Sequence, residues 1–524
     1  MFGTSTNAGW CRLVILAAIQ SAVGLLPLGG VATAQQLGPS TAAALSPATQ
    51  DYFRALLPMF AKAPRPAKIY QQGGIPALVP KLEVDWNPFG KVGTYLPGGP
   101  VNTADNAFFQ ALGTNGRSCA TCHQPSSGMG LSLRNVRARF NATAGRDPLF
   151  APVDGADCPS TVGADPEAAT RHDLHAVILN RASIRIPLPW PPKDGQGEPK
   201  PVEFDITITP QEDKPGCNVD PAYGLEAGFV SVYRRPLMTA QLNFKTLRPD
   251  GKGPILPGSV MWDGREPSLE QQAVNATLGH GQATRVPTPA QLRQMVQFQN
   301  KIFSAQLTDA EAGRLDADGG KGGPILLYRQ TPEQAFGPTF DEYDRWGRSA
   351  DKRRSIRRGQ DIFNNRLFIV QAVAGFNDRP DVGDLAISSC STCHNTAHAG
   401  SDALDNPQRD IGIGGTAQFI GGPKPAALLP RFTLNCHADA QPHPYLGRGP
   451  IVTNDPGLAL LTGKCTDIGK FTLPQLRALA AREPYFHDGS ARTLKDVVDI
   501  YNRRFSIGLT SRDQQDLINF LSAL

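Results

Sequence analysis

The sequence predicts a mainly α fold in which two small helical domains are joined by long loops, and three observations predict it. The pentapeptides CATCH (119–123) and CSTCH (390–394) lie about half the chain apart. Each follows a stretch whose phenylalanines recur at helical spacing. Proline (46 residues) and glycine (53 residues) are abundant, which favours long irregular connections over a compact helical bundle. A chain of 524 residues is long enough for about two to four such domains.

The two pentapeptides are CxxCH motifs, which attach c-type haem. Both thiols add to the haem vinyl groups, and the adjacent histidine becomes an axial ligand of the iron. A zinc site would need a second CxxC or a paired histidine close by, and neither motif has one. The sequence therefore predicts two covalently bound c-type haems, held by two sets of residues: Cys119, Cys122 and His123, and Cys390, Cys393 and His394.

The spacing of the motifs predicts two cytochrome c-like haem domains. The N-terminal one is expected over 105–345 and the C-terminal one over 346–524. A proline-rich insertion at about 140–228 interrupts the first domain, and its role is not evident from its composition. Residues 35–104 are expected to form an N-terminal arm that packs on the haem domains.

The first 34 residues have the pattern of a secretory signal peptide. Arg12 precedes an apolar run that extends to about residue 28, and small residues follow up to Ala34. A membrane anchor is the alternative, but polar residues and a proline interrupt the apolar run. We therefore expect cleavage near Ala34 and a periplasmic protein with no membrane span.

Four cysteines outside the motifs form an even set, once Cys11 leaves with the signal peptide. In an oxidising compartment such a set favours disulfides. The simplest pairing by proximity is Cys158–Cys217 and Cys436–Cys465, with buried thiols as the alternative.

The net charge of +5 is mild and mixed in sign, which gives no reason to expect a nucleic-acid partner. The basic runs at 352–358 and 501–505 are interpreted as solvated helix faces or as docking patches for an electron donor.

Two further stretches, RRPLMTAQLNF…VMWDGREPSLEQQA (234–273) and PYFHDGSARTLKDVVDIYNRRF (484–505), carry a family resemblance. With the two haem motifs, they resemble the bacterial diheme cytochrome c peroxidase family, which includes MauG. The resemblance covers roughly 105–139 and 229–524. It implies that hydrogen peroxide reacts at the N-terminal haem, while the C-terminal haem exchanges electrons with a small redox protein or a protein substrate.

The resemblance also implies catalytic residues in the first domain. Trp262 matches the family's tryptophan between the haems, where an indole relays electrons or simply fills the core. Gln272 matches a glutamine near peroxide, but the glutamate expected ten residues later is Gln282 here. An amide cannot accept a proton, so His280 is the candidate base, with a surface histidine or a sixth iron ligand as alternatives.

The resemblance bears on the iron ligands as well. Family members often close the N-terminal iron with a histidine where this chain has Arg139, so an open iron is expected unless Met129 ligates it. Tyr501 aligns with the methionine ligand of the C-terminal haem, and a phenolate would favour ferric iron; otherwise Tyr501 is a core residue of an amphipathic helix. Arg235 and Arg482 stand at the family's calcium positions, which makes calcium a doubtful cofactor.

Two other functions compete with the peroxidase interpretation. One is a diheme electron-transfer protein without turnover, in which both irons are six-coordinate. The other is a diheme oxygenase resembling the rubber-cleaving enzymes, which also lack the carboxylate.

Overall fold

The computed structural model describes residues 68–524 with several gaps: 73, 75, 164–165, 210–215, 247–259, 331–339, 349–350, 396–398 and 402–407. Every described residue belongs to one compact unit, Ala67–Leu524. The predicted signal peptide and the first part of the predicted arm lie outside the described residues.

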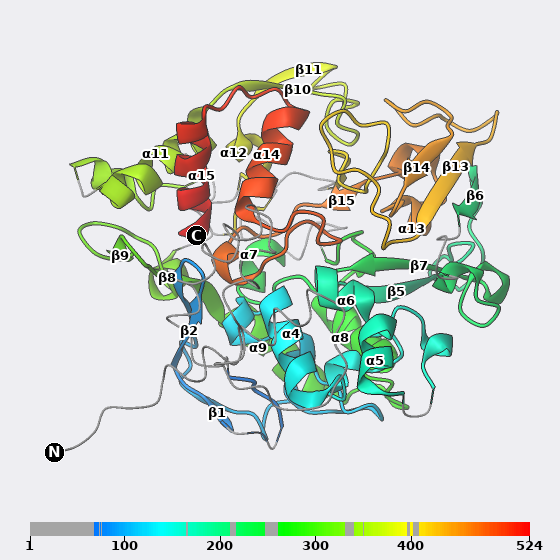
Figure 1. Ribbon diagram of the computed structural model, residues 1–524, viewed down its shortest axis with the longest axis horizontal. Coiled ribbons are helices and arrows are strands. Elements are labelled where there is room, and N and C mark those ends of the chain that lie inside the picture. Colours follow the sequence, from blue (N-terminus) through cyan, green and yellow to red (C-terminus); the bar gives the residue numbers. More distant parts are fainter. Residues whose placement is uncertain are drawn as a thin grey trace, which may run out of the picture. The chain divides into compact units, whose positions relative to one another are not determined.

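Helices occur between Cys119 and Ser522 (Figure 1), and the two cysteines of each CxxCH motif lie on a short helix. Their bounds are α3 Cys119–Cys122, α4 Leu133–Thr143, α5 Ala168–Leu174, α6 Ala176–Arg181, α7 Leu242–Thr246, α8 Leu269–Gly279, α9 Pro289–Lys301, α10 Pro324–Arg329, α11 Asp351–Asn365, α12 Cys390–Cys393, α13 Ala459–Thr462, α14 Leu494–Arg504 and α15 Ser511–Ser522.

Strands form six small sheets among the described residues, and every pairing in them is antiparallel. The sheet orders are β1-β4, β2-β3-β8-β9, β5-β7, β14-β13-β6, β10-β11 and β12-β15. Their bounds are β1 Leu78–Val79, β2 Leu82–Asn87, β3 Gly90–Tyr95, β4 Val101–Asn102, β5 Ile184–Pro189, β6 Phe204–Thr209, β7 Phe229–Arg234, β8 Phe303–Asp309, β9 Gly313–Arg314, β10 Phe368–Gln371, β11 Leu385–Ser388, β12 Gln408–Arg409, β13 Arg431–Cys436, β14 Ile451–Thr453 and β15 Phe471–Thr472.

The expectation of a mainly α fold is not confirmed, because these sheets stand beside the helices. Two short segments of the sequence do have the alternating pattern of a strand. FDITIT in β6 and RFTLNC in β13 both alternate between buried and more exposed side chains, the period-2 pattern of a strand. Neither run is long, and each is stabilised by a partner more than two hundred residues away.

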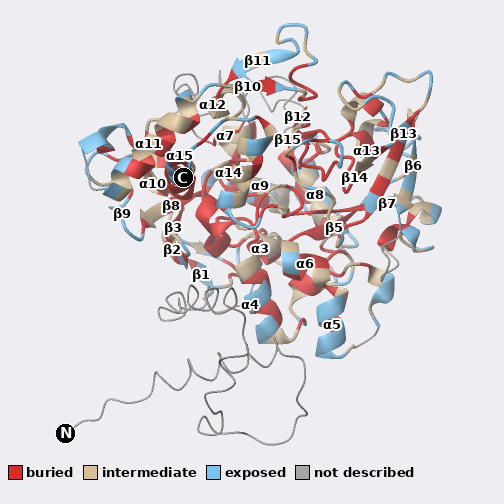
Figure 2. Ribbon diagram, turned by 45° about the horizontal axis from the view of Figure 1, so that its top comes forward, coloured by how far each residue is buried: buried red, intermediate tan, exposed pale blue. Residues whose placement is uncertain are grey.

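The C-terminal helices pack around an apolar core. Helices α14 and α15 both begin with a capping box, formed by Thr493 with Asp496 and by Thr510 with Asp513. Their buried faces enclose a core cluster that contains Phe363 of α11, Val498 of α14 and Phe520 of α15. Figure 2 shows the exposed residues on outer elements such as α5 and β11.

The predicted insertion pairs with the C-terminal part of the chain. Strand β6 lies in register with β13, with Phe204 opposite Cys436 and Thr209 opposite Arg431. Strand β5 of the insertion pairs with β7, which begins directly after the insertion, and the apolar residues Ile184, Ile186 and Val232 of this ribbon are buried. Phe204 and Phe432 belong to the same core cluster, so this segment is part of the molecular core.

Both predicted disulfides are confirmed. Cys158 pairs with Cys217 inside the insertion, with Cα atoms 5.1 Å apart. Cys436 at the end of β13 pairs with Cys465, with Cα atoms 6.0 Å apart. Neither disulfide includes a cysteine of the CxxCH motifs.

No helix within the described ranges is both long and apolar enough to cross a bilayer.

Candidate haem sites

The two CxxCH motifs have the same local structure. In each, the two cysteines lie on a single helical turn, α3 or α12, that begins after a serine. The serine backbone N–H donates to a threonine hydroxyl three residues later, from Ser118 to Thr121 and from Ser389 to Thr392, each at 3.0 Å. The shared sequence Ser-Cys-x-Thr-Cys-His therefore orients both thiols and the histidine in the same way.

Both haem histidines are oriented by a carbonyl six residues downstream. His123 Nδ1 lies 3.1 Å from the Met129 carbonyl oxygen, and His394 Nδ1 lies 2.6 Å from the Gly400 carbonyl oxygen. A carbonyl oxygen only accepts, so Nδ1 carries the proton and Nε2 is left to ligate a metal. Burial lowers the pKa of His123 to about 4, which keeps its imidazole in the neutral, ligating form.

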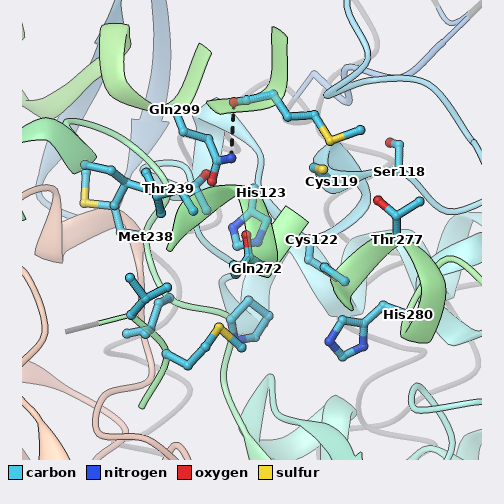
Figure 3. Close-up of a pocket in the computed structure, with 18 of the residues that line it drawn as sticks. Ser118, Cys119, Cys122, His123, Met238, Thr239, Gln272, Thr277, His280 and Gln299 are labelled. Carbon is cyan, nitrogen blue, oxygen red and sulfur yellow. Dashed lines mark hydrogen bonds between the residues drawn. The ribbon is translucent and has the colours of Figure 1, made fainter. Parts of the chain in front are cut away.

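A cavity opens directly above the first motif. It holds about 1440 Å³ of space, including its opening to solvent. Cys119, Cys122 and His123 line it (Figure 3). The cavity is lined by Trp262 as well. Its apolar wall comes from several segments of the chain: Ile184, Ile186, Leu237, Leu242, Leu269 and Met295.

The residues of this cavity fit a c-type haem. Thiols, a neutral histidine and an apolar wall provide the covalent attachment, the axial ligand and the ring contacts. Arg235 Nε and Gln475 Oε1 also line the cavity, are buried, and have no hydrogen-bond partner among the described residues. Buried polar atoms normally have partners, and a haem propionate, which accepts hydrogen bonds, would supply one for the Arg235 Nε–H.

Helix α8 and its C-cap residue contribute the polar side chains of Gln272 and His280 to the cavity. The helix begins after Ser268, whose hydroxyl accepts a hydrogen bond from the Gln271 N–H at 3.1 Å. Gln272, Ala276 and His280 recur every four residues, so they share one helix face, and all three line the cavity. The structure thus brings Gln272 and His280 together with the CATCH motif.

Gln282 lies outside this cavity. Helix α8 ends at Gly279, and the chain turns away so that Gln282 is exposed with a positive φ of 53°. Its side-chain oxygen accepts a hydrogen bond from Asn115 Nδ2 at 3.2 Å. The side chain at this position contacts the loop before the CATCH motif.

The imidazole of His280 is hydrogen-bonded to Asp154, which was not among the site residues predicted from the sequence. Its Nδ1 is hydrogen-bonded to Asp154, and the other oxygen of Asp154 pairs with Arg117. Asp154 belongs to the predicted insertion, and no local motif connects it with α8. Only the folding of the insertion against the CATCH segment brings the two together.

The side chains of Met129 and Arg139 pack against or bind other protein groups near the first motif. Met129 is fully buried in a core with Phe108 and does not line the cavity. Arg139 pairs with Asp147 at 2.5 Å and donates to the Thr121 carbonyl at 2.5 Å.

Trp262 is buried, and a hydrogen bond from its ring nitrogen fixes its orientation. The Nε1–H donates to the Arg235 carbonyl at 2.8 Å. The ring packs with Ile413 and Phe471, and partly buried Phe486 contacts the same cluster. Trp262 therefore lines the first haem cavity and also contacts residues of the C-terminal part of the chain.

The residues after Trp262 fix a turn. The Asp263 carboxylate accepts a hydrogen bond from the Arg265 N–H at 3.3 Å, and Gly264 has a φ of 71°. Arg234 pairs with Asp263 and also with Asp455, the latter at 2.7 Å. Burial alone would raise the pKa of Asp263, but Arg265 and Arg234 hold it below its usual value.

Tyr501 lies on α14 near the second motif. Its ring centroid is 6.3 Å from that of Phe486 and 6.1 Å from that of Phe505. Burial raises the pKa of Tyr501, and the Cys393 and Cys390 thiols act in the same direction, so the phenol is close to the CSTCH segment.

At the predicted calcium positions, one guanidinium is hydrogen-bonded to the nearby carbonyls. Arg235 Nη2 donates to the carbonyls of Leu131 and Arg482, each at 2.6 Å. Burial and, to a smaller extent, the neighbouring Arg482 lower the pKa of Arg235 to about 9.

Several known proteins are similar to this chain. It is 26% identical over 285 residues to cytochrome-c peroxidase IdrP1 of Pseudomonas sp. (strain SCT), covering 51% of this chain and 64% of that protein. It is 23% identical over 283 residues to methylamine utilization protein MauG of Methylophilus methylotrophus, with the same coverage of 51% and 64%. A shorter match of 142 residues, at 28% identity, joins it to cytochrome-c peroxidase IdrP2 of Denitromonas iodatirespirans, over 26% of this chain and 35% of that protein.

The chain thus spans just under two thirds of the length of the first of these relatives. No protein-family model matches the sequence.

Two solved structures are similar at low identity. One is a MauG-like protein associated with microbial copper homeostasis, with 15% identity, a TM-score of 0.33 and coverage of 80% of this chain and 87% of that one. The other is hydrazine synthase of Kuenenia stuttgartiensis, with 16% identity, a TM-score of 0.29 and coverage of 75% and 93%. The sequence matches and the two CxxCH motifs support the similarity of this chain to diheme cytochrome c peroxidases and MauG.

Proposed function

We propose that the protein is an exported diheme c-type oxidoreductase that reacts with hydrogen peroxide at its N-terminal haem. One observation carries this proposal: Gln272 and His280, on one face of α8, line the same cavity as Cys119, Cys122 and His123. Beside a haem attachment site, an imidazole can move a proton between the peroxide oxygens and an amide can hold peroxide by hydrogen bonds.

The haem, when bound, supplies the iron at which the O–O bond of peroxide is broken. Gln272 holds peroxide by hydrogen bonds, because its amide both donates and accepts. His280 takes up the proton of one peroxide oxygen on Nε2 and delivers it to the other oxygen, which then leaves as water. Gln282 is exposed and, as an amide, cannot accept a proton, so it takes no part in proton transfer.

The C-terminal haem, held by Cys390, Cys393 and His394, exchanges electrons in this proposal. Tyr501 is the candidate second ligand of its iron, which would favour the ferric state. Trp262 relays electrons between the two haem sites. In support, Trp262 contacts a cluster that includes Phe486, and Phe486 packs against Tyr501.

The substrate is hydrogen peroxide, and the electrons come from a small redox protein or from a protein substrate. The location is periplasmic, and two disulfides suit that oxidising compartment. Calcium is left out of the proposal because Arg235 already donates to the carbonyls of Leu131 and Arg482.

The test is the rate at which the haem-loaded protein reacts with peroxide, measured by stopped-flow absorption at the Soret band. His280→Gln keeps a polar side chain but removes the proton acceptor, and should slow the reaction about 10²–10⁴-fold. The matched control is His437→Gln, because His437 is a partly exposed histidine that contacts Asp205 and does not line the cavity. An unchanged rate in His280→Gln would remove His280 from the mechanism.

A further inference from the structure

Asp154 is a buried carboxylate from the insertion that is held from three sides. Its side chain is only 2% exposed. One oxygen pairs with Arg117, the other contacts His280 Nδ1, and the Asp154 carbonyl accepts a hydrogen bond from the Arg185 N–H at 2.9 Å. Its position is therefore fixed relative to both the CATCH segment and strand β5.

Arg117 ties this carboxylate to the haem attachment site. It lies two residues before Cys119 and is itself anchored, because Nε donates to the Pro148 carbonyl and Nη2 to the Leu149 carbonyl, each at 2.7 Å. Burial alone would raise the pKa of Asp154, but Arg117 and His280 lower it. Asp154 is thus an ionised acceptor.

The bond to Asp154 determines the tautomer of His280. An ionised carboxylate accepts but does not donate, so the proton of the neutral imidazole is on Nδ1 and Nε2 carries a lone pair. None of the hydrogen bonds between described residues involves His280 Nε2. The side chain of His280 lines the cavity beside Cys122 (Figure 3) and is 34% exposed.

We propose that Asp154 is a positioning residue that holds His280 with its proton on Nδ1, so that Nε2 serves as the proton acceptor of the first haem site. The inference rests on the proposed function and deepens it. It also gives the insertion a role, because position 282, where the resemblance leads one to expect a carboxylate, holds a glutamine.

A carboxylate bound to imidazole orients the ring and raises its basicity, and losing such a partner typically costs 10–100-fold in activity. The charged groups around His280 are Asp154 and, beyond it, Arg117, and the neighbouring His123 is held neutral by burial. With Asp154 replaced by asparagine, the Arg117 charge would no longer be balanced and the imidazole would become a weaker base.

The rate at which cyanide binds to the ferric, haem-loaded protein tests the positioning role of Asp154 without peroxide turnover. Hydrogen cyanide must lose its proton to bind iron, so a neighbouring base speeds the reaction. Asp154→Asn should slow both cyanide association and the peroxide reaction by about 10–100-fold. The matched control is Asp147→Asn, since Asp147 is a carboxylate of the same segment whose ion pair, to Arg139, does not reach the cavity.

A double-mutant cycle distinguishes an effect of Asp154 that acts through His280 from a general disturbance of the site. If Asp154 acts through His280, then Asp154→Asn causes no further slowing in a His280→Gln background. Equal slowing in both backgrounds, or unchanged cyanide and peroxide rates in the single variant, would overturn the proposal. Haem content and thermal unfolding are measured for every variant.

If Asp154→Asn does not fold, Asp154→Glu replaces it, because this variant keeps a negative charge beside Arg117 while shifting the carboxylate. The proposal requires that Asp154→Glu slows cyanide association in the native background and has no effect in the His280→Gln background. An unchanged rate in the native background, or equal slowing in both backgrounds, overturns the proposal. If cyanide association depends on Asp154 but peroxide does not react, the positioning role stands and the peroxide function fails.

Discussion

The indole of Trp262 lies edge-on to the imidazole of His487, with ring centroids 6.2 Å apart and planes at 72°. His487 in turn stacks on Phe471 at 4.1 Å. This group of buried aromatic rings joins the wall of the first haem cavity to the C-terminal part of the chain.

Trp262→Phe should slow electron transfer between the haems by at least an order of magnitude while leaving both haems attached. The substitution keeps a ring in the core but removes the larger, more easily oxidised indole. The measurement is the rate at which peroxide oxidises the reduced C-terminal haem. Trp190→Phe, in the insertion, is the control; equal rates in the native protein and Trp262→Phe would show that Trp262 only fills the core.

Tyr501→Met should raise the reduction potential of the C-terminal haem by an amount on the order of 100 mV, because a thioether favours ferrous iron and a phenolate favours ferric iron. A spectroelectrochemical titration measures the shift. Tyr223→Met is the control, since Tyr223 packs on Arg185 in the insertion. If the potential and the absorption spectrum stay the same in Tyr501→Met, Tyr501 is not a ligand.

The buried His487 should make the free energy of unfolding decrease when the pH is lowered. Burial lowers the pKa of His487 below its ordinary value of about 6.5, although Asp488 and Asp455 oppose this shift. Below pH 6.5 the unfolded chain binds a proton that the folded chain does not, so the free energy of unfolding falls by up to about 1.4 kcal/mol per pH unit until the folded-state pKa is reached.

Denaturant unfolding between pH 7 and pH 5 measures this slope. His487→Phe preserves a ring beside Phe471 and should flatten the curve. A variant that keeps the full slope would assign the acid sensitivity to other groups.

Replacing Cys436 and Cys465 together by alanine should lower the free energy of unfolding by about 2–4 kcal/mol, because the disulfide restricts the unfolded chain. Thermal unfolding measures the change. A reducing agent should destabilise the native protein more than this double variant, which retains only the Cys158–Cys217 disulfide. Equal sensitivity of the two proteins would contradict a stabilising role for Cys436–Cys465.

Features encoded locally could be predicted from the sequence. CxxCH is a five-residue signal, and the structure forms it as the same capped turn at Cys119 and at Cys390. The two disulfides followed from proximity along the chain. Gln272 was proposed from the family resemblance, and His280 because it lies two residues before position 282, where the resemblance leads one to expect a carboxylate.

Features that depend on distant contacts could not be predicted. The six-residue strand β6 has a weak pattern of its own and is stabilised by pairing with β13. Asp154 carries no motif, and its role depends on how the insertion folds against Arg117 and α8. The overestimate of helix has the same origin, because short strands gain their stability from partners that a local pattern does not reveal.

The most direct test of the central claim is to add one equivalent of hydrogen peroxide to the ferric, haem-loaded protein and record the absorption spectrum. If the cavity above His123 is a peroxide site, the ferric protein has a high-spin component that disappears as the Soret band shifts. An all-low-spin spectrum that peroxide leaves unchanged would contradict the account and favour a diheme electron-transfer protein without turnover.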